Sequence, residues 1–255
     1  MKKSYYILLL IIALGIFEYL APFYFEGSFI DPNEGVLHWG VISLVFIVLT
    51  LVALFAEFEN FATSAKQIAL ISMLGTVSGI SRIPFAAAMN FQPCTFFIIC
   101  SGYVFGPMAG FMVGALTAII SNLFLGHGPW TAYQIFTWGL IGIFSGFLGK
   151  IPMPSEKYRI ALLVPFGILA GVMYAMIINT WFMALYRYPH NVDVYKGVLY
   201  TATFWTISHS AANAFFLIVL GNKVINVMDR FKIRFFWTWE GSRDKLQMVP
   251  ETAHG

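Results

Sequence analysis

The feature that most constrains this chain is a series of apolar stretches that are almost free of charged residues. They run near 5–24, 37–57, 67–83, 94–105, 108–125, 132–149, 159–184 and 198–222. A helix needs about 20 apolar residues to cross the hydrocarbon core of a bilayer. Only 11% of the residues are charged, against about 25% in soluble domains, so a water-facing surface cannot be built. The sequence predicts an all-α polytopic membrane protein with about eight spans.

Two of these stretches need a closer look. The fourth, 94–105, is short for a hydrocarbon core of about 30 Å, so we expect it to be tilted or covered by a neighbouring loop. The first follows Lys2 and Lys3 and could be mistaken for a signal peptide. Its apolar run is long, however, and the residues around Pro22 fit a cleavage site poorly. We therefore interpret it as a retained first helix.

The positive charges are distributed unevenly between the two sides of the predicted bundle. If the N-terminus is cytoplasmic, the outer segments hold only Arg82, Arg187 and Lys196, and all other Lys and Arg residues fall on the inner side. This bias satisfies the positive-inside rule. It predicts a multi-pass protein of the cell membrane with both termini in the cytoplasm. No basic stripe lies outside the membrane flanks, so we expect no nucleic-acid partner.

Small residues recur at four-residue spacing on several helices. They form the sets Gly75/Gly79, Gly106/Gly110/Gly114, Gly142/Gly146 and Gly167/Gly171. Such stripes let helix backbones approach closely in a membrane. They serve either packing inside the bundle or docking to a partner membrane protein. The first set, extended by Ser72, is the best candidate for docking.

Polar and aromatic residues gather toward the predicted outer side. Binding sites combine apolar walls with a few placed polar groups, so these residues could line one outward-facing pocket. Gln134 and Trp138 lie one turn apart, and Trp205, His209 and Asn213 follow at four-residue spacing. The candidate substrate-binding residues are Asn90, Gln92, Thr95, Asn122, Trp130, Gln134, Trp138, Asn179, Trp205, His209 and Asn213.

Each of these residues also has a purely structural interpretation. The tryptophans could belong to the interfacial aromatic belt. The side chains of Gln134 and Asn179 could form hydrogen bonds that only join helices. His209 and Asn213, deeper in the membrane, could have the same role. Arg82 could extend its guanidinium group to the outer interface. From the residues alone, these alternatives stay open.

The sequence holds no pattern that indicates catalysis. It has no paired carboxylates inside the predicted bundle, no Cys/His cluster with metal spacing and no phosphate-binding loop. We therefore expect no catalytic residue, metal or cofactor. A membrane-bound solute-binding protein without its own ATPase is the main hypothesis. A lipid-modifying membrane enzyme and a structural membrane protein are the alternatives.

Three motifs in order carry a resemblance to a known family. They are Gly106-Pro107-Met-Ala-Gly110, Gly126-His-Gly-Pro129-Trp130 and Gly139-Leu-Ile-Gly142. Over about residues 64–226 the chain resembles the substrate-binding S component of energy-coupling factor (ECF) transporters. The resemblance implies a six-helix bundle that binds a vitamin from outside. It also implies two kinds of partner, a membrane coupling protein and two ABC-type ATPases that drive uptake.

The resemblance also suggests a substrate, a docking face and a domain division. Gln92-Pro93-x-Thr95 together with Gly-x-Gly-Pro-Trp-Thr resembles the branch for cobalamin or corrinoid precursors. The family docks its coupling protein through small residues on its first helix, where this chain has Ala69, Ser72, Gly75 and Gly79. The expected division is two extra helices of unassigned role (1–62), the S-component-like bundle (63–228) and a cytoplasmic tail that is amphipathic and then polar (229–255).

Overall fold

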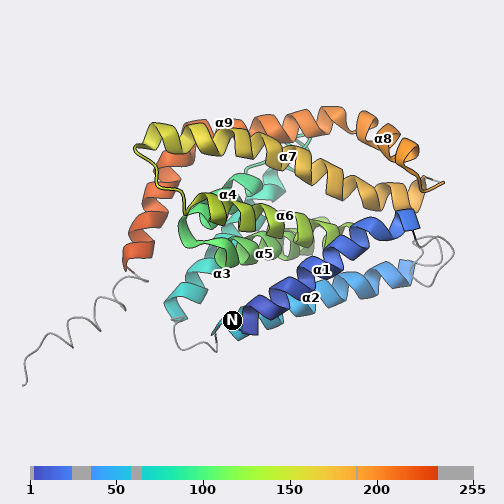
Figure 1. The fold of residues 1–255 in the computed structure, drawn as a ribbon, viewed down its shortest axis with the longest axis horizontal. Coiled ribbons are helices and arrows are strands. Elements are labelled where there is room, and N and C mark those ends of the chain that lie inside the picture. Colours follow the sequence, from blue (N-terminus) through green and yellow to red (C-terminus); the bar gives the residue numbers. More distant parts are fainter. Residues whose placement is uncertain (1–2, 25–35, 59–64, 188, 235–255) are drawn as a thin grey trace, which may run out of the picture.

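The structure is a computed structural model that describes residues 3–24, 36–58, 65–187 and 189–234. Within these residues it contains helices only (Figure 1). Their bounds are α1 Lys3–Tyr24, α2 Val36–Phe58, α3 Ala65–Arg82, the 3-10 helix η2 Ile83–Phe85, α4 Cys94–Phe105, α5 Pro107–Leu125, α6 Trp130–Leu148, α7 Glu156–Tyr186, α8 Val192–Thr201 and α9 Thr203–Lys232.

The predicted all-α polytopic membrane fold is confirmed. Among the described residues, six helices are long and apolar enough to cross a membrane, namely α1, α3, α5, α6, α7 and α9. The other two predicted spans are shorter apolar segments, Val41–Ala56 within α2 and Cys94–Phe105 in α4. Nine of the twelve residues of α4 are buried, so this short helix is covered by its neighbours.

The start of the last predicted span was wrong. Residues 198–201 belong to α8, a separate helix that leads into α9 at Thr203. The apolar pattern missed α8 because Asp193 and Lys196 interrupt it. The helix begins there because the Asn191 side chain accepts hydrogen bonds from the backbone N–H groups of Asp193 and Val194, which satisfies donors that a helix start leaves free.

The core of the bundle is built on α4, α5 and α6, and its helices touch through their glycines. The backbones of Gly110 on α5 and Gly142 on α6 lie against each other, and Gly114 lies against the backbone of Trp138. Gly106 joins α4 to α5 with a φ of 94°, which favours glycine because it has no side chain. Internal packing, the first of the two interpretations of the glycine stripes, is confirmed for Gly110, Gly114 and Gly142.

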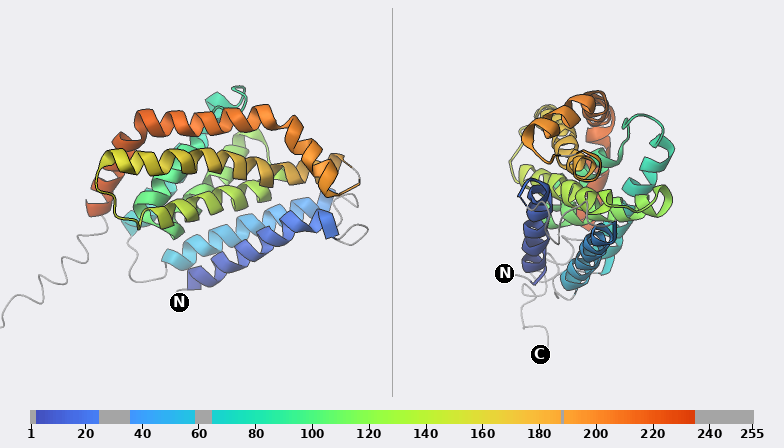
Figure 2. Two further views of the ribbon diagram at one scale, coloured as in Figure 1. Left: turned by 45° about the horizontal axis from the view of Figure 1, so that its top comes forward. Right: turned by 90° about the vertical axis from the view of Figure 1, so that its right-hand side faces the viewer.

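Four of the remaining helices lie against this core in two pairs, and α3 packs on α5. Helices α7 and α9 lie side by side along one flank, and the α1–α2 hairpin lies along another flank, where it contacts α6 (Figures 1 and 2). Apart from η2 and α8, successive helices run in opposite directions along the bundle, so their ends gather at two ends of the bundle (Figure 1). We call the end that carries Lys66, Lys150, Lys157 and Lys223 the basic end, and the other the opposite end.

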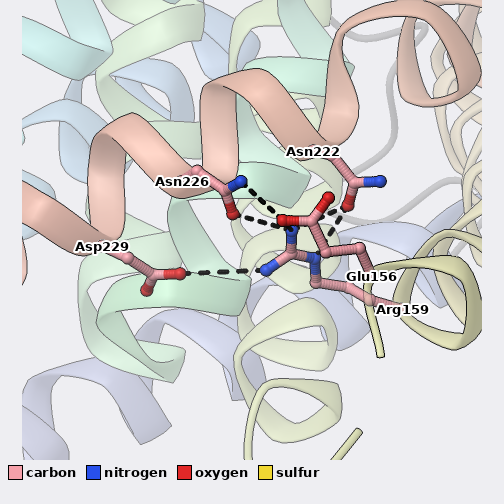
Figure 3. Close-up of polar contacts among 5 residues, drawn as sticks. All are labelled: Glu156, Arg159, Asn222, Asn226 and Asp229. Carbon is pink, nitrogen blue, oxygen red and sulfur yellow. Dashed lines mark hydrogen bonds and ion pairs between the residues drawn. The ribbon is translucent and has the colours of Figure 1, made fainter. Parts of the chain in front are cut away.

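A polar cluster ties α7 to α9 at the basic end (Figure 3). Arg159 donates from Nε and Nη2 to Asn222 Oδ1, at 3.0 and 2.7 Å, and from Nη2 to Asn226 Oδ1 at 2.8 Å. Asp229 Oδ2 lies 3.9 Å from Arg159 Nη1. The cluster and the helix both continue past residue 228, so the expected domain boundary there falls inside α9. The boundary expected at 62 lies outside the described residues.

Candidate functional site

The site begins where α3 and α5 end. Arg82 is the last residue of α3, and its Nη1 donates to Ser121 Oγ and Asn122 Oδ1, both at 3.0 Å. Ser121 and Asn122 are buried in the last turn of α5. Arg82 is therefore held by two neutral side chains inside the bundle and does not simply reach for the interface.

Asn122 carries the network on to α6 and α7. Its Nδ2 donates to Thr131 Oγ1 at 3.1 Å and to Gln134 Oε1 at 2.7 Å. Gln134 Nε2 in turn donates to the hydroxyl group of Tyr174 on α7 at 3.4 Å. The side-chain amides of Asn122 and Gln134 each have a partner at the oxygen and at the nitrogen. These partners fix the orientation of both amides.

A second chain of hydrogen bonds joins α4, α6 and α9. Trp138 Nε1 donates to Thr95 Oγ1 at 3.1 Å, and Thr95 Oγ1 shares a hydrogen bond with His209 Nε2 at 2.8 Å. All three side chains are buried. The hydroxyl group of Thr95 therefore links a helix that carries an indole to one that carries an imidazole.

Aromatic contacts hold the two hydrogen-bonded chains together. The rings of Trp138 and Tyr174 stack at 5.2 Å with an interplanar angle of 26°, and His209 meets Tyr174 edge-on at 4.8 Å. The Arg82 guanidinium carbon lies 5.3 Å from the centre of the Trp138 ring, within the range of a cation–π interaction. We call the whole set the polar network: Arg82, Thr95, Ser121, Asn122, Thr131, Gln134, Trp138, Tyr174 and His209.

The polar network joins several helices, and it also has properties that are typical of a binding site. Buried polar groups in a membrane are costly, and they mark functional sites by default. The network contains one cation, and the partners of Arg82 given above are all neutral. Among the described residues, two buried nitrogens, Gln92 Nε2 and His209 Nδ1, have no hydrogen-bond partner. An unsatisfied buried polar atom of this kind calls for an explanation, such as a group that a ligand would supply.

The structure brings five of the eleven predicted binding residues into this network, namely Thr95, Asn122, Gln134, Trp138 and His209. Asn90 lies outside it, half-exposed in the segment between η2 and α4, with a φ of 67°. The Trp130 ring lies tilted against the ring of Trp181, with ring centres 5.3 Å apart, and Trp130 donates to the carbonyl group of Gly126. Gln92 is buried, and its unpartnered nitrogen keeps it a candidate.

Three more predicted residues lie outside the network, in addition to Asn90, Gln92 and Trp130. Asn179 donates to the Ala175 carbonyl group in its own helix, and Asn213 donates to the Gly167 carbonyl group of α7. Trp205 is 47% exposed on α9. Four-residue spacing advances about 40° around a helix at each step, so Trp205 and Asn213 are each turned about 40° away from His209, to opposite sides.

The sequence analysis left four members of the network out of the predicted site. Tyr174 is the most informative, since it sits in an apolar helix without a polar neighbour in sequence. It does follow Gly171 by three residues, on the face where α7 packs against Ser210 of α9. The three-residue spacing from Gly171 is the sequence feature that could have placed Tyr174 on the inner face of α7. Arg82, Ser121 and Thr131 lie in the predicted outer segments but had no pattern that joined them.

The expected docking face on α3 is split by the structure. A side chain at Gly75 would meet Leu116, and one at Gly79 would meet Ile120, so both glycines face α5. Ala69 is exposed and Ser72 half-exposed on another side of the helix. Gly75 and Gly79 therefore pack against α5 inside the bundle, and docking through α3 stays a prediction.

Comparison with known proteins covers most of the bundle. The sequence model of a family described as "ECF-type riboflavin transporter, S component" matches residues 57–230, close to the 64–226 of the resemblance. That range holds every residue of the polar network. It leaves out α1 and nearly all of α2.

Curated relatives match over a shorter stretch. A UPF0397 protein of Clostridium perfringens is 22% identical over 115 residues, which cover 43% of this chain and 62% of the relative. A UPF0397 protein of Vibrio atlanticus is 30% identical over 99 residues, which cover 37% of this chain and 52% of the relative. The chain thus spans about half to three fifths of the length of these relatives. No solved structure matches it.

Proposed function

This chain belongs to the family of ECF-type riboflavin transporter S components, and on that premise we propose that it is a membrane-embedded substrate-binding subunit. In this role it binds a vitamin from outside the cell and passes it to an ATPase-driven coupling module. The observation that carries the proposal is the buried polar network, which gathers side chains from six helices at one end of the matched bundle. Residues 63–228 would form the binding unit, in a cell membrane with both termini cytoplasmic.

We propose a flavin as the ligand, in place of the cobalamin or corrinoid that the sequence motifs suggested. The description of the matching family names riboflavin, and the comparisons lend no support to the cobalamin branch. The polar network suits a flat heteroaromatic ring. Trp138 and Tyr174 offer ring faces for stacking. Asn122 and Gln134 offer amide donors and acceptors that could exchange their mutual bond for the polar edge of a flavin.

The ligand can be tested directly with the purified protein in detergent. We expect riboflavin to bind with strong quenching of its own fluorescence, because an indole ring would stack on it. Gln134→Ala should weaken binding at least tenfold, since an unpaired buried polar group costs about 1–3 kcal/mol. The matched control is Asn179→Ala, whose amide bonds only its own helix. Cobalamin, measured by equilibrium dialysis, should not compete; binding of cobalamin alone would overturn the flavin assignment.

The partners remain a proposal that rests on the family. They would be a membrane coupling protein and two ABC-type ATPases, with contact through the exposed part of α3. We choose Ala69 and not Gly75 for the test, because Ala69 is exposed and Gly75 packs on α5. We expect Ala69→Leu to leave ligand affinity unchanged and to abolish ATP-driven uptake in vesicles that contain the complete transporter. The control is Ala211→Leu, an exposed alanine on α9. Normal uptake by Ala69→Leu would place docking elsewhere.

A further inference from the structure

Helices α1 and α2 lie almost entirely outside the matched residues 57–230, and they enclose a cavity of their own. Its volume is about 210 Å³, and both helices contribute to its walls. Apart from one glutamate, the residues that line it are apolar. Phe17, Val41 and Val45 on these walls are 40%, 56% and 41% exposed, so the cavity opens on the outer face of the hairpin as a groove.

The exception in the groove is Glu18 of α1. Its side chain is buried, with 3% of the residue exposed, and neither carboxyl oxygen has a hydrogen-bond partner in the part of the chain that the structure describes. The backbone around it is anchored. The hydroxyl group of Tyr133 donates to the Glu18 carbonyl oxygen at 3.2 Å, and Gly15 packs against the ring of Phe136 on α6. The fold therefore fixes Glu18 in the groove wall, with its carboxyl group just beneath the apolar surface of the groove.

The size and chemistry of the groove define what fits it. Pockets for drug-sized ligands run from about 300 to 1,000 Å³, so 210 Å³ suits a smaller group. Apolar walls favour a hydrocarbon body. A carboxyl group with both oxygens unpaired needs a donor or a cation, because buried charges in membranes pair with opposite charges.

We propose that the α1–α2 groove binds a small apolar amine from the bilayer, with its nitrogen on the carboxyl group of Glu18. A neutral amine would take the carboxyl proton, and an ammonium ion would meet a carboxylate. Both routes give the same ion pair without net charge, which the apolar walls tolerate. The groove lies on α1 and α2, and the polar network lies on α3 to α7 and α9. This amine site is therefore separate from the proposed vitamin site.

The probe is 4-fluorobenzylamine, and its binding to the full chain in detergent is measured by fluorine NMR. The control ligand is 4-fluorobenzyl alcohol, which has a similar shape and no charge. We expect the amine to bind at least tenfold more tightly than the alcohol. Glu18→Gln should remove that difference, because an amide cannot form the ion pair. Val45→Trp should block both probes by filling the groove, whereas Val48→Trp, exposed on the same helix, should leave both unchanged.

Three results would overturn the proposal. They are equal binding of amine and alcohol to the unmodified chain, undiminished amine preference in Glu18→Gln, and undiminished amine binding in Val45→Trp. Riboflavin affinity should stay unchanged in all three variants, since none of these residues belongs to the polar network. Loss of the amine site alone therefore cannot be confused with failure of the proposed vitamin site.

Discussion

Gly142→Leu should prevent the chain from forming a stable bundle. A side chain at this position would overlap the backbone of Gly110, and a backbone cannot rotate away as a side chain can. Overpacking a core typically costs about 1–3 kcal/mol and occasionally more. Here α5 and α6 would have to separate, and their contact supports α4 as well. We expect most of the protein to aggregate on size-exclusion chromatography, and any folded fraction to melt well below the unmodified chain.

The control for this substitution is Gly197→Leu on α8. A side chain added at Gly197 meets no atom within 4 Å. The same leucine should therefore leave both the elution profile and the melting temperature nearly unchanged. A monodisperse Gly142→Leu protein with a normal melting temperature would mean that the α5–α6 contact is not as close as the structure places it.

Asn122→Leu should have the largest effect on ligand binding. Leucine matches the size of asparagine but offers no polar atom. Arg82 would lose one of its two neutral partners, and Thr131 and Gln134 would lose the amide that donates to them. Hydrogen bonds to charged groups contribute about 1.5–3 kcal/mol and unpaired buried groups cost about 1–3 kcal/mol. We expect riboflavin affinity to fall at least a hundredfold, together with a lower melting temperature.

The matched control is the same substitution at the other end of the bundle. Asn222→Leu removes an amide oxygen that accepts from Arg159 at 3.0 and 2.7 Å. It should lower the melting temperature by a similar amount without changing riboflavin affinity. If Asn122→Leu weakened binding no more than Asn222→Leu does, the network would be structural support, and the ligand would bind elsewhere.

The positions of the helices could be predicted from the sequence, because a long apolar stretch by itself indicates a segment that is buried in lipid or protein. The glycine motifs also identified the family, since close helix contacts leave few residue choices. The residues of the site were harder. Asn122 and Gln134 belong to different helices, and their pairing depends on the register between α5 and α6. That register is set by Gly114 against Trp138, a contact that no single stretch of sequence contains.

Two other predicted residues show the same difficulty. Gly75 and Asn213 have the residue types of a docking face and a binding site, and in the structure each contacts a neighbouring helix. Small residues and amides serve helix packing as readily as they serve ligands. Their role is decided by which helix lies opposite. Tyr174 shows the converse, since an isolated tyrosine in an apolar helix becomes central once α6 packs against it.

The shortness of α4 bears on how a solute would reach the polar network. Its twelve residues rise about 18 Å, so a centred α4 leaves about 6 Å of hydrocarbon depth uncovered at each end. In that placement Thr95, which lies in the first turn of α4, would sit below the level where the headgroups begin. A solute would then shed its hydration shell before it meets the hydroxyl group of Thr95. Dehydration on the way in, and not contact alone, would then discriminate against phosphorylated forms of the same vitamin.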